Sequence, residues 1–175
     1  MGDIMAADKL IAKNILDTKV LSPSEGGTYL VIADDSEEFP IALHYAMGQA
    51  RINQGHLGIL YAMQFEDFQH WENVESKMRK EKRDQAEKYI WNIAQAVYAE
   101  LGECPVLYMG EGNIQDVLVD TLENDPEVVQ LVLSAHTGGK GPGPLVSYMT
   151  AKAMHRISVP VVIVPAHFEG DDIEN

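Results

Sequence analysis

Five short apolar runs alternate with longer segments of helical composition, and this alternation restricts the fold more than any other feature of the sequence. The runs are continuously apolar, which is typical of strands buried on both faces of a parallel sheet. Alternating strands and helices form such sheets with right-handed crossovers and helices on both faces. We therefore predict an α/β fold, a single-domain Rossmann-like three-layer α/β/α sandwich, whose five parallel strands are residues 28–33, 57–63, 104–109, 128–133 and 159–165.

The intervening segments have helical spacing of apolar residues and predict four helices, at 38–53, 68–101, 114–123 and 145–156. Ser36 is placed to cap the first of them, and Pro40 lies in its first turn. In the long second helix, Trp71 and Trp91 fall on the apolar side and are expected in the core. The charge run 77–88 reads as a solvated face that could also form a partner surface.

The length of 175 residues and the apolar content of 46% fit one globular domain. Residues 28–165 form that domain in our reading. Residues 1–27 read as an extension, with a short helical piece at 6–16 that packs on the domain or on a partner. The acidic tail 166–175 has little to bury and is predicted to be disordered.

Composition excludes several functional classes. A formal charge of −14 and a pI near 4.7 repel phosphate backbones, so we expect no nucleic-acid partner and no membrane partner. Cys104 is the single cysteine, which rules out an intrachain disulfide, and its position beside Pro105 predicts a buried, inert thiol. The N-terminus lacks the apolar core of a signal peptide, so a cytoplasmic location is expected.

The fourth strand runs into a glycine-crowded loop, residues 134–144, and then into a helix. Glycines let a backbone pass close to a ligand, and the N–H groups at a helix start attract anions. The turn at Asp34, Asp35 and Ser36 follows the first strand in the same way. If the first and fourth strands are neighbours, both turns line one crevice at the carboxyl edge of the sheet, where such folds bind ligands.

The segment 28–165 resembles the universal stress protein family. The first strand and its Asp34-Asp-Ser-Glu-Glu turn are similar to the Val-Asp-Gly-Ser-Glu turn of that family. The segments at 59–63, 110–117, 128–134 and 159–165 are similar to its second strand, third-helix entry, fourth strand and fifth strand. The resemblance implies a sheet order of 3-2-1-4-5.

Family members that bind ATP carry Gly, two residues, Gly, nine residues, Gly and then Ser or Thr after the fourth strand. The matching positions here are Ser134, Thr137, Ser147 and Tyr148, so the three motif glycines are absent. Shifted glycines, Lys140 and Thr150 could form a different anion cradle. The loop is therefore either a rebuilt anion site or a closed one, and the Gly-Pro-Gly-Pro-Leu-Val-Ser sequence resembles that of a bacterial subgroup of the family.

The resemblance implies a dimeric regulatory module of the stress response that binds ATP or AMP, with Mg²⁺ if the ligand is ATP, without fast turnover. The implied site consists of Asp34, Ala62, Ser134, Thr137, Gly138, Gly139, Lys140, Gly141, Ser147 and Thr150. The alternative is a family member without nucleotide, whose dimer is a scaffold for unidentified protein partners and whose pocket is filled by Ser134, Thr137, Tyr148 and the Pro-rich loop. A third, weaker reading is an enzyme of the related adenine nucleotide alpha-hydrolase folds.

No residue has the setting of a catalytic group, and at most slow ATP hydrolysis is expected. His136 reads as a solvated or turn-bonding side chain, and the histidines show no metal-ligand spacing. The fifth strand forms a sheet edge, and an apolar edge must be covered or paired. Members of the family pair this strand across a two-fold axis, so the resemblance implies a homodimer through Val161, Val162, Ile163 and Val164.

Overall fold

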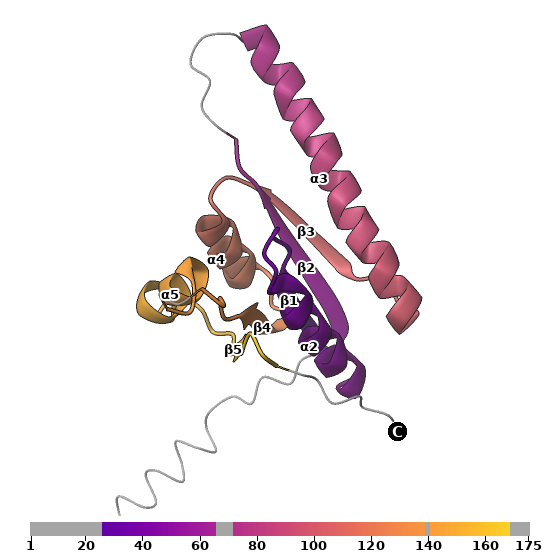
Figure 1. The fold of residues 1–175 in the computed structure, drawn as a ribbon, viewed down its shortest axis with the longest axis vertical. Helices are drawn as coiled ribbons and strands as arrows, with labels where there is room; N and C mark the ends of the chain where they lie inside the picture. Colours follow the sequence, from indigo (N-terminus) through magenta and orange to yellow (C-terminus); the bar gives the residue numbers. More distant parts are fainter. Residues whose placement is uncertain (1–25, 66–71, 139–140, 169–175) are drawn as a thin grey trace, which may run out of the picture.

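The computed structural model of the chain describes residues 26–65, 72–138 and 141–168. Within these residues the strands form one parallel sheet in the order β3-β2-β1-β4-β5 (Figure 1). This confirms the predicted fold class and strand order. The strands are β1 (Thr28–Ile32), β2 (His56–Met63), β3 (Val106–Glu111), β4 (Val128–Ser134) and β5 (Val161–Val164).

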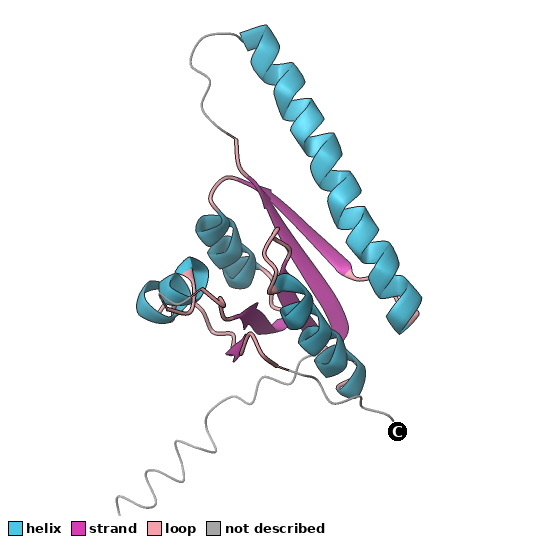
Figure 2. Cartoon of the chain, viewed as in Figure 1, coloured by secondary structure: helices cyan, strands magenta, loops and turns pink. Residues whose placement is uncertain are grey.

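Helices lie on both faces of the sheet (Figure 2). The predicted helix at 6–16, the start of the long helix at 68–71 and most of the acidic tail lie outside the described residues. No helix in the described ranges is long and apolar enough to cross a membrane. The helices are α2 (Phe39–Ile52), α3 (Glu72–Leu101), α4 (Ile114–Asn124) and α5 (Pro144–Tyr148), which continues into the π-helical turn η2 (Met149–Ala153).

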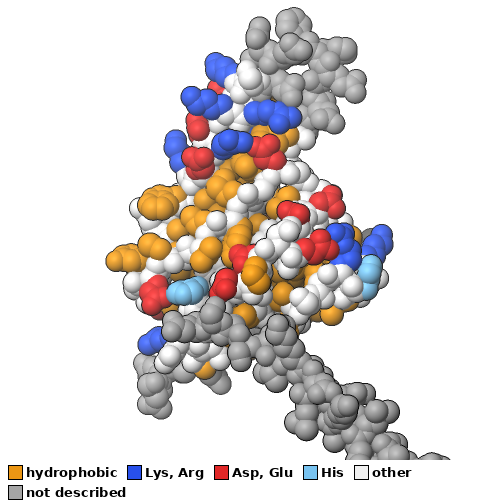
Figure 3. Space-filling view, turned by 180° about the vertical axis from the view of Figure 1, so that it is seen from behind, with side chains coloured by type: hydrophobic (Ala, Val, Ile, Leu, Met, Phe, Trp, Pro, Cys, Tyr) orange, Lys and Arg blue, Asp and Glu red, His pale blue; other side chains and the backbone are white. Residues whose placement is uncertain are grey.

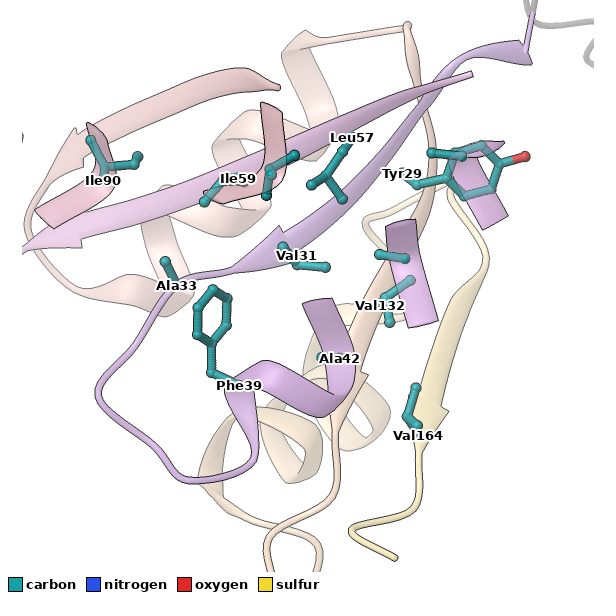
Figure 4. Close-up of a cluster of buried hydrophobic side chains, with 13 residues drawn as sticks. Tyr29, Val31, Ala33, Phe39, Ala42, Leu57, Ile59, Ile90, Val132 and Val164 are labelled. Atoms are coloured by element: carbon teal, nitrogen blue, oxygen red, sulfur yellow. The ribbon is translucent and has the colours of Figure 1, made fainter. Parts of the chain in front are cut away.

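Alternate residues of β1 enter two hydrophobic clusters. Tyr29 and Val31 pack with α2 and α3, and Figure 4 shows this cluster with residues from β2, β4 and β5. Leu30 and Ile32 point to the other face, against α4, α5 and η2. Burying a side chain such as Leu30 stabilises the fold by about 1.5–3 kcal/mol. The continuous apolar run of β1 therefore reflects burial on both faces.

Two helix predictions need correction. Ser36 does not cap α2: the residue before the helix is Glu38, and the Ser36 hydroxyl donates to Asp34 Oδ1 instead. The helix predicted at 145–156 begins one residue earlier and changes from α to π geometry at Met149. A single π turn has no pattern of its own in a sequence, so apolar spacing predicts one continuous helix.

Two side chains predicted in the interior are exposed. Trp91 is 57% exposed, because it lies about 100° around the helix from Ile90, whereas the buried face of the described part of α3 consists of Ala86, Ile90, Ala94 and Val97. Cys104 is also exposed, since it precedes the edge strand β3. Trp71 lies outside the described residues.

Candidate ligand cleft between the first and fourth strands

A cleft of about 270 Å³ lies at the carboxyl ends of β1 and β4. These strands are neighbours, paired through Val31 and Val132, and the polar turns that follow them meet at the same edge. This juxtaposition was predicted from the sequence, and it is where doubly wound sheets bind ligands. The cleft is lined by Ile32, Asp34, Ser36, Glu38, Ala42, Val132, Leu133, Ser134, His136, Pro142, Gly143, Pro144, Leu145 and Val146.

Asp34 is held in a tight turn on the β1 side of the cleft. Its Oδ1 accepts hydrogen bonds from the Ser36 backbone N–H at 3.1 Å and from the Ser36 hydroxyl at 2.5 Å. The Tyr89 hydroxyl of α3 donates to the Asp34 carbonyl at 2.9 Å. Asp34 therefore has the turn-forming role that short acidic side chains take after strands, and it faces the cleft at the same time.

Glu38, which also follows β1, holds the glycine loop that follows β4. Its Oε1 accepts hydrogen bonds from the Thr137 backbone N–H at 2.8 Å and from the Thr137 hydroxyl at 2.6 Å. His136 Nδ1 lies 3.1 Å from the same oxygen. The Glu38 side chain is only 6% exposed, and the hydrogen bonds from Thr137 lower the pKa of its carboxyl to about 2. Glu38 is therefore an ionised side chain within the cleft.

The loop folds around His136. The backbone N–H of His136 donates to the Pro142 carbonyl at 3.1 Å, and this hydrogen bond joins the two ends of the loop. A Cβ on Gly138 would lie 2.5 Å from His136 Nε2, and Gly143 has a φ of 99°, which favours glycine. Gly143 is thus favoured by its backbone conformation, and a side chain at Gly138 would displace the His136 ring.

The predicted site residues separate into three groups. Asp34 and Ser134 line the cleft, and Thr137 and Gly138 contact its wall through Glu38 and His136. Gly139 and Lys140 lie outside the described residues. The remaining four are not lining residues: Ala62 is half-buried on β2, Gly141 is exposed, Ser147 is exposed on α5 and Thr150 donates to the Val146 carbonyl.

Sequence reasoning missed Glu38. Its partner Thr137 is 99 residues away, so no local spacing could reveal the contact. The signal that existed was positional, since Glu38 lies between the β1 turn and the following helix and so must be at the carboxyl edge of the sheet. His136 also has a partner that spacing did not identify.

Tyr148 is not among the residues lining the cleft. It is half-buried and packs against the cluster of residues beneath α4 and α5. The idea that Tyr148 fills the pocket is therefore wrong, whereas Pro142 and Pro144 of the Pro-rich loop do line the cleft.

The described residues that line the cleft include two carboxylates and no Lys or Arg. The basic residues of the charge run lie instead on α3, where Arg79 and Lys82 stack on the Phe65 ring and Arg83 pairs with Glu111. No group of three or more His, Cys, Asp or Glu suited to a metal ion occurs in the described ranges.

The sheet order defines a Rossmann-like α/β protein, and the cleft lies at the topological switch point of its sheet. The model of the universal stress protein family matches residues 28–165, and the chain belongs to this family. A comparison with curated proteins gives no match.

Solved structures agree with this fold. The universal stress protein UspA from Lactobacillus plantarum is 18% identical, with a TM-score of 0.66 over 81% of this chain and 99% of that chain. A member of the family from Burkholderia pseudomallei is 17% identical, with a TM-score of 0.57 over 81% and 98%. A universal stress protein in complex with cAMP is 19% identical, with a TM-score of 0.53 over 81% and 98%.

Proposed function

We propose that this universal stress protein is a cytoplasmic regulatory module that binds an adenine nucleotide in the β1–β4 cleft without fast turnover. The observation that carries the proposal is the meeting of Asp34 and Ser134 in one cleft with apolar walls. Ligand sites typically combine apolar walls with a few polar groups in this way. The complex of a universal stress protein with cAMP supports a nucleotide as the ligand class.

The cleft favours a nucleotide with one phosphate over ATP. Its volume of about 270 Å³ is close to the lower end of the roughly 300–1,000 Å³ of small-molecule pockets. Asp34 can accept hydrogen bonds from sugar hydroxyls, whereas the carboxylates of Asp34 and Glu38 repel a highly charged triphosphate. We therefore expect AMP to bind more tightly than ATP, and Lys140 remains a proposed phosphate ligand.

Calorimetric titration with adenosine, AMP, ADP and ATP tests this proposal. Asp34→Asn keeps an oxygen for the Ser36 hydrogen bonds but replaces the second carboxylate oxygen, the acceptor proposed for the sugar hydroxyls, with an NH₂ donor. It is therefore expected to weaken the binding of adenosine and AMP about tenfold or more. Asp35→Asn is the matched control, because Asp35 is exposed and not a lining residue. Absence of heat and of a thermal shift at millimolar nucleotide would contradict the proposal.

A protein-interaction scaffold is the second candidate. We define an apolar strip by four side chains that are each between 36% and 57% exposed: Trp91, Tyr98, Leu107 and Met109. Tyr89 and Trp91 lie on opposite flanks of α3 because of the helical turn between them. The Tyr89 ring contacts Tyr61 of β2, so Trp91 and Tyr98 face the other way, toward the edge strand β3. Figure 3 shows hydrophobic side chains gathered beside the charged end of the molecule. Exposed apolar patches of this kind mark interaction sites.

Crosslinking in cells distinguishes this candidate. Trp91→Asp should abolish crosslinks to a partner, while Met154→Asp, an exposed apolar residue outside the strip, should keep them. Mass spectrometry of the purified protein adds a second readout, because a bound nucleotide would be released on unfolding and a scaffold would release none. Equal crosslinking by both variants would contradict a role for the apolar strip.

A homodimer through β5 is also part of the proposal. In the described sheet β5 is an edge strand, and its Ile163 side chain is 38% exposed. Edge strands of this kind are commonly covered by a partner.

A further inference from the structure

We propose that Glu38 is an internal anion that competes with the phosphate of a nucleotide for the donors of the loop after β4. This inference takes its ligand, a nucleotide, from the proposed function. The contact between Glu38 and Thr137 on which it is built is a feature of the chain itself. It makes Glu38 a residue that sets specificity: the resting site accepts the nucleoside part and resists each added phosphate.

The contact has the composition of an occupied anion site. Two donors of Thr137 converge on a single oxygen, Glu38 Oε1, at 2.8 and 2.6 Å, and His136 Nδ1 lies 3.1 Å away. Backbone N–H groups, hydroxyls and histidine also bind phosphate oxygens, since carboxylate and phosphate accept the same charge-assisted hydrogen bonds. The loop thus holds an anion that the chain itself supplies.

The position of the contact places it in competition with a ligand. Glu38 and His136 line the same cleft as Asp34 and Ser134. A phosphate that approached the Thr137 N–H would meet donors already in use and a negative charge within a few ångströms. Because the Glu38 side chain is only 6% exposed, water screens this repulsion weakly.

Glu38→Gln isolates the charge from the shape of the contact. The amide oxygen of glutamine can still accept both hydrogen bonds from Thr137, so the loop can keep its fold around His136. The matched control is Glu37→Gln, which removes the same charge from the adjacent exposed residue, which is not a lining residue. A difference in nucleotide affinity between the two variants would show that the position of the charge matters, and not only the net charge of the protein.

The experiment is a titration of the wild-type protein and both variants with adenosine, AMP, ATP and inorganic phosphate. Glu38→Gln should raise the affinity for AMP at least about tenfold and the affinity for ATP more, while adenosine changes by less than about twofold. Glu37→Gln should leave all affinities close to those of the wild type. An unchanged ratio of AMP to adenosine affinity in Glu38→Gln, or an equal gain in Glu37→Gln, would overturn the inference.

Two arms separate this inference from the proposed function. If adenosine and AMP bind no form of the protein, the nucleotide proposal fails, but phosphate binding by Glu38→Gln alone still supports the internal anion. If, in that case, inorganic phosphate also binds neither the wild type nor either variant, the internal-anion inference is overturned. If Glu38→Gln does not fold, as judged by circular dichroism, nuclear magnetic resonance of the wild type replaces it: saturating ATP should shift the Thr137 amide signal and adenosine should not, and equal shifts overturn the inference.

Discussion

The carboxylate of Glu38, which directly precedes α2, accepts two hydrogen bonds from Thr137, which lies 99 residues later in the chain. This contact joins the first helix of the domain to the glycine loop and forms one wall of the β1–β4 cleft. The same side chain therefore affects stability, the shape of the loop and the charge of the site.

The Glu38 contact predicts a dependence of stability on pH. The folded protein keeps Glu38 ionised down to a pKa of about 2, below the ordinary value of 4.5. A lowered pKa stabilises the folded state above pH 4.5, and this contribution is lost as the pH falls toward 2. Urea unfolding should show that the advantage of the wild type over Glu38→Gln shrinks across this window. A difference that is constant with pH would contradict the assignment.

Gly110 is predicted to be required for the packing of α4 on β3. A Cβ at Gly110 would lie 2.3 Å from Val117 Cγ1, so Gly110→Ala should destabilise the fold by about 1–3 kcal/mol. Gly48→Ala is the control, since open space surrounds that position in the interior of α2. It should stabilise the protein by up to about 1 kcal/mol. Chemical unfolding of both variants checks the pair, and equal effects would contradict this account of the packing.

The Tyr108 hydroxyl is predicted to stabilise the connection between α4 and β4. It donates to Asp125 Oδ2 at 2.7 Å, and burial together with Asp125 raises the pKa of Tyr108. Tyr108→Phe should cost about 1–2 kcal/mol, because a hydrogen bond to a charged acceptor is lost. Tyr98→Phe, at an exposed position, should change stability by less than about 0.5 kcal/mol. Denaturant midpoints that match for the two variants would argue against the Tyr108 contact.

The proposed dimer predicts a mass in solution of twice 19.4 kDa. Ile163→Lys places a charge on the exposed part of β5 and should produce a monomer. Met154→Lys, an equally drastic change that is not on β5, should leave the dimer intact. Size-exclusion chromatography with light scattering measures both, and a monomeric wild type would refute the dimer.

The fold was predictable because burial on both faces leaves a strong pattern. The run from Thr28 to Ala33 is buried throughout, and its short length, its β-branched residues and the turn residues that flank it favour a strand over a helix. Side chains on the edges of elements were harder to predict. Trp91 follows the buried Ile90 by one residue, and whether that flank is covered depends on how far α3 lies from β3, which the sequence does not encode locally.

The candidate site was predictable in its location but not in its contacts. Asp34 and Ser134 each follow a strand, so topology alone brings them to one cleft. The Glu38 contact with Thr137 depends on the path of the glycine loop, which folds around His136. Motif spacing describes glycines that this chain lacks, and so it could not show that a carboxylate occupies the loop.

The most direct test of the nucleotide site is a nuclear magnetic resonance titration of the ¹⁵N-labelled wild-type protein with AMP. We predict saturable shifts of the Asp34, Ser134 and His136 amide signals, with little change on the apolar strip at Trp91 and Tyr98. Saturable shifts confined to α3, or no shifts at millimolar AMP, would contradict nucleotide binding in the β1–β4 cleft.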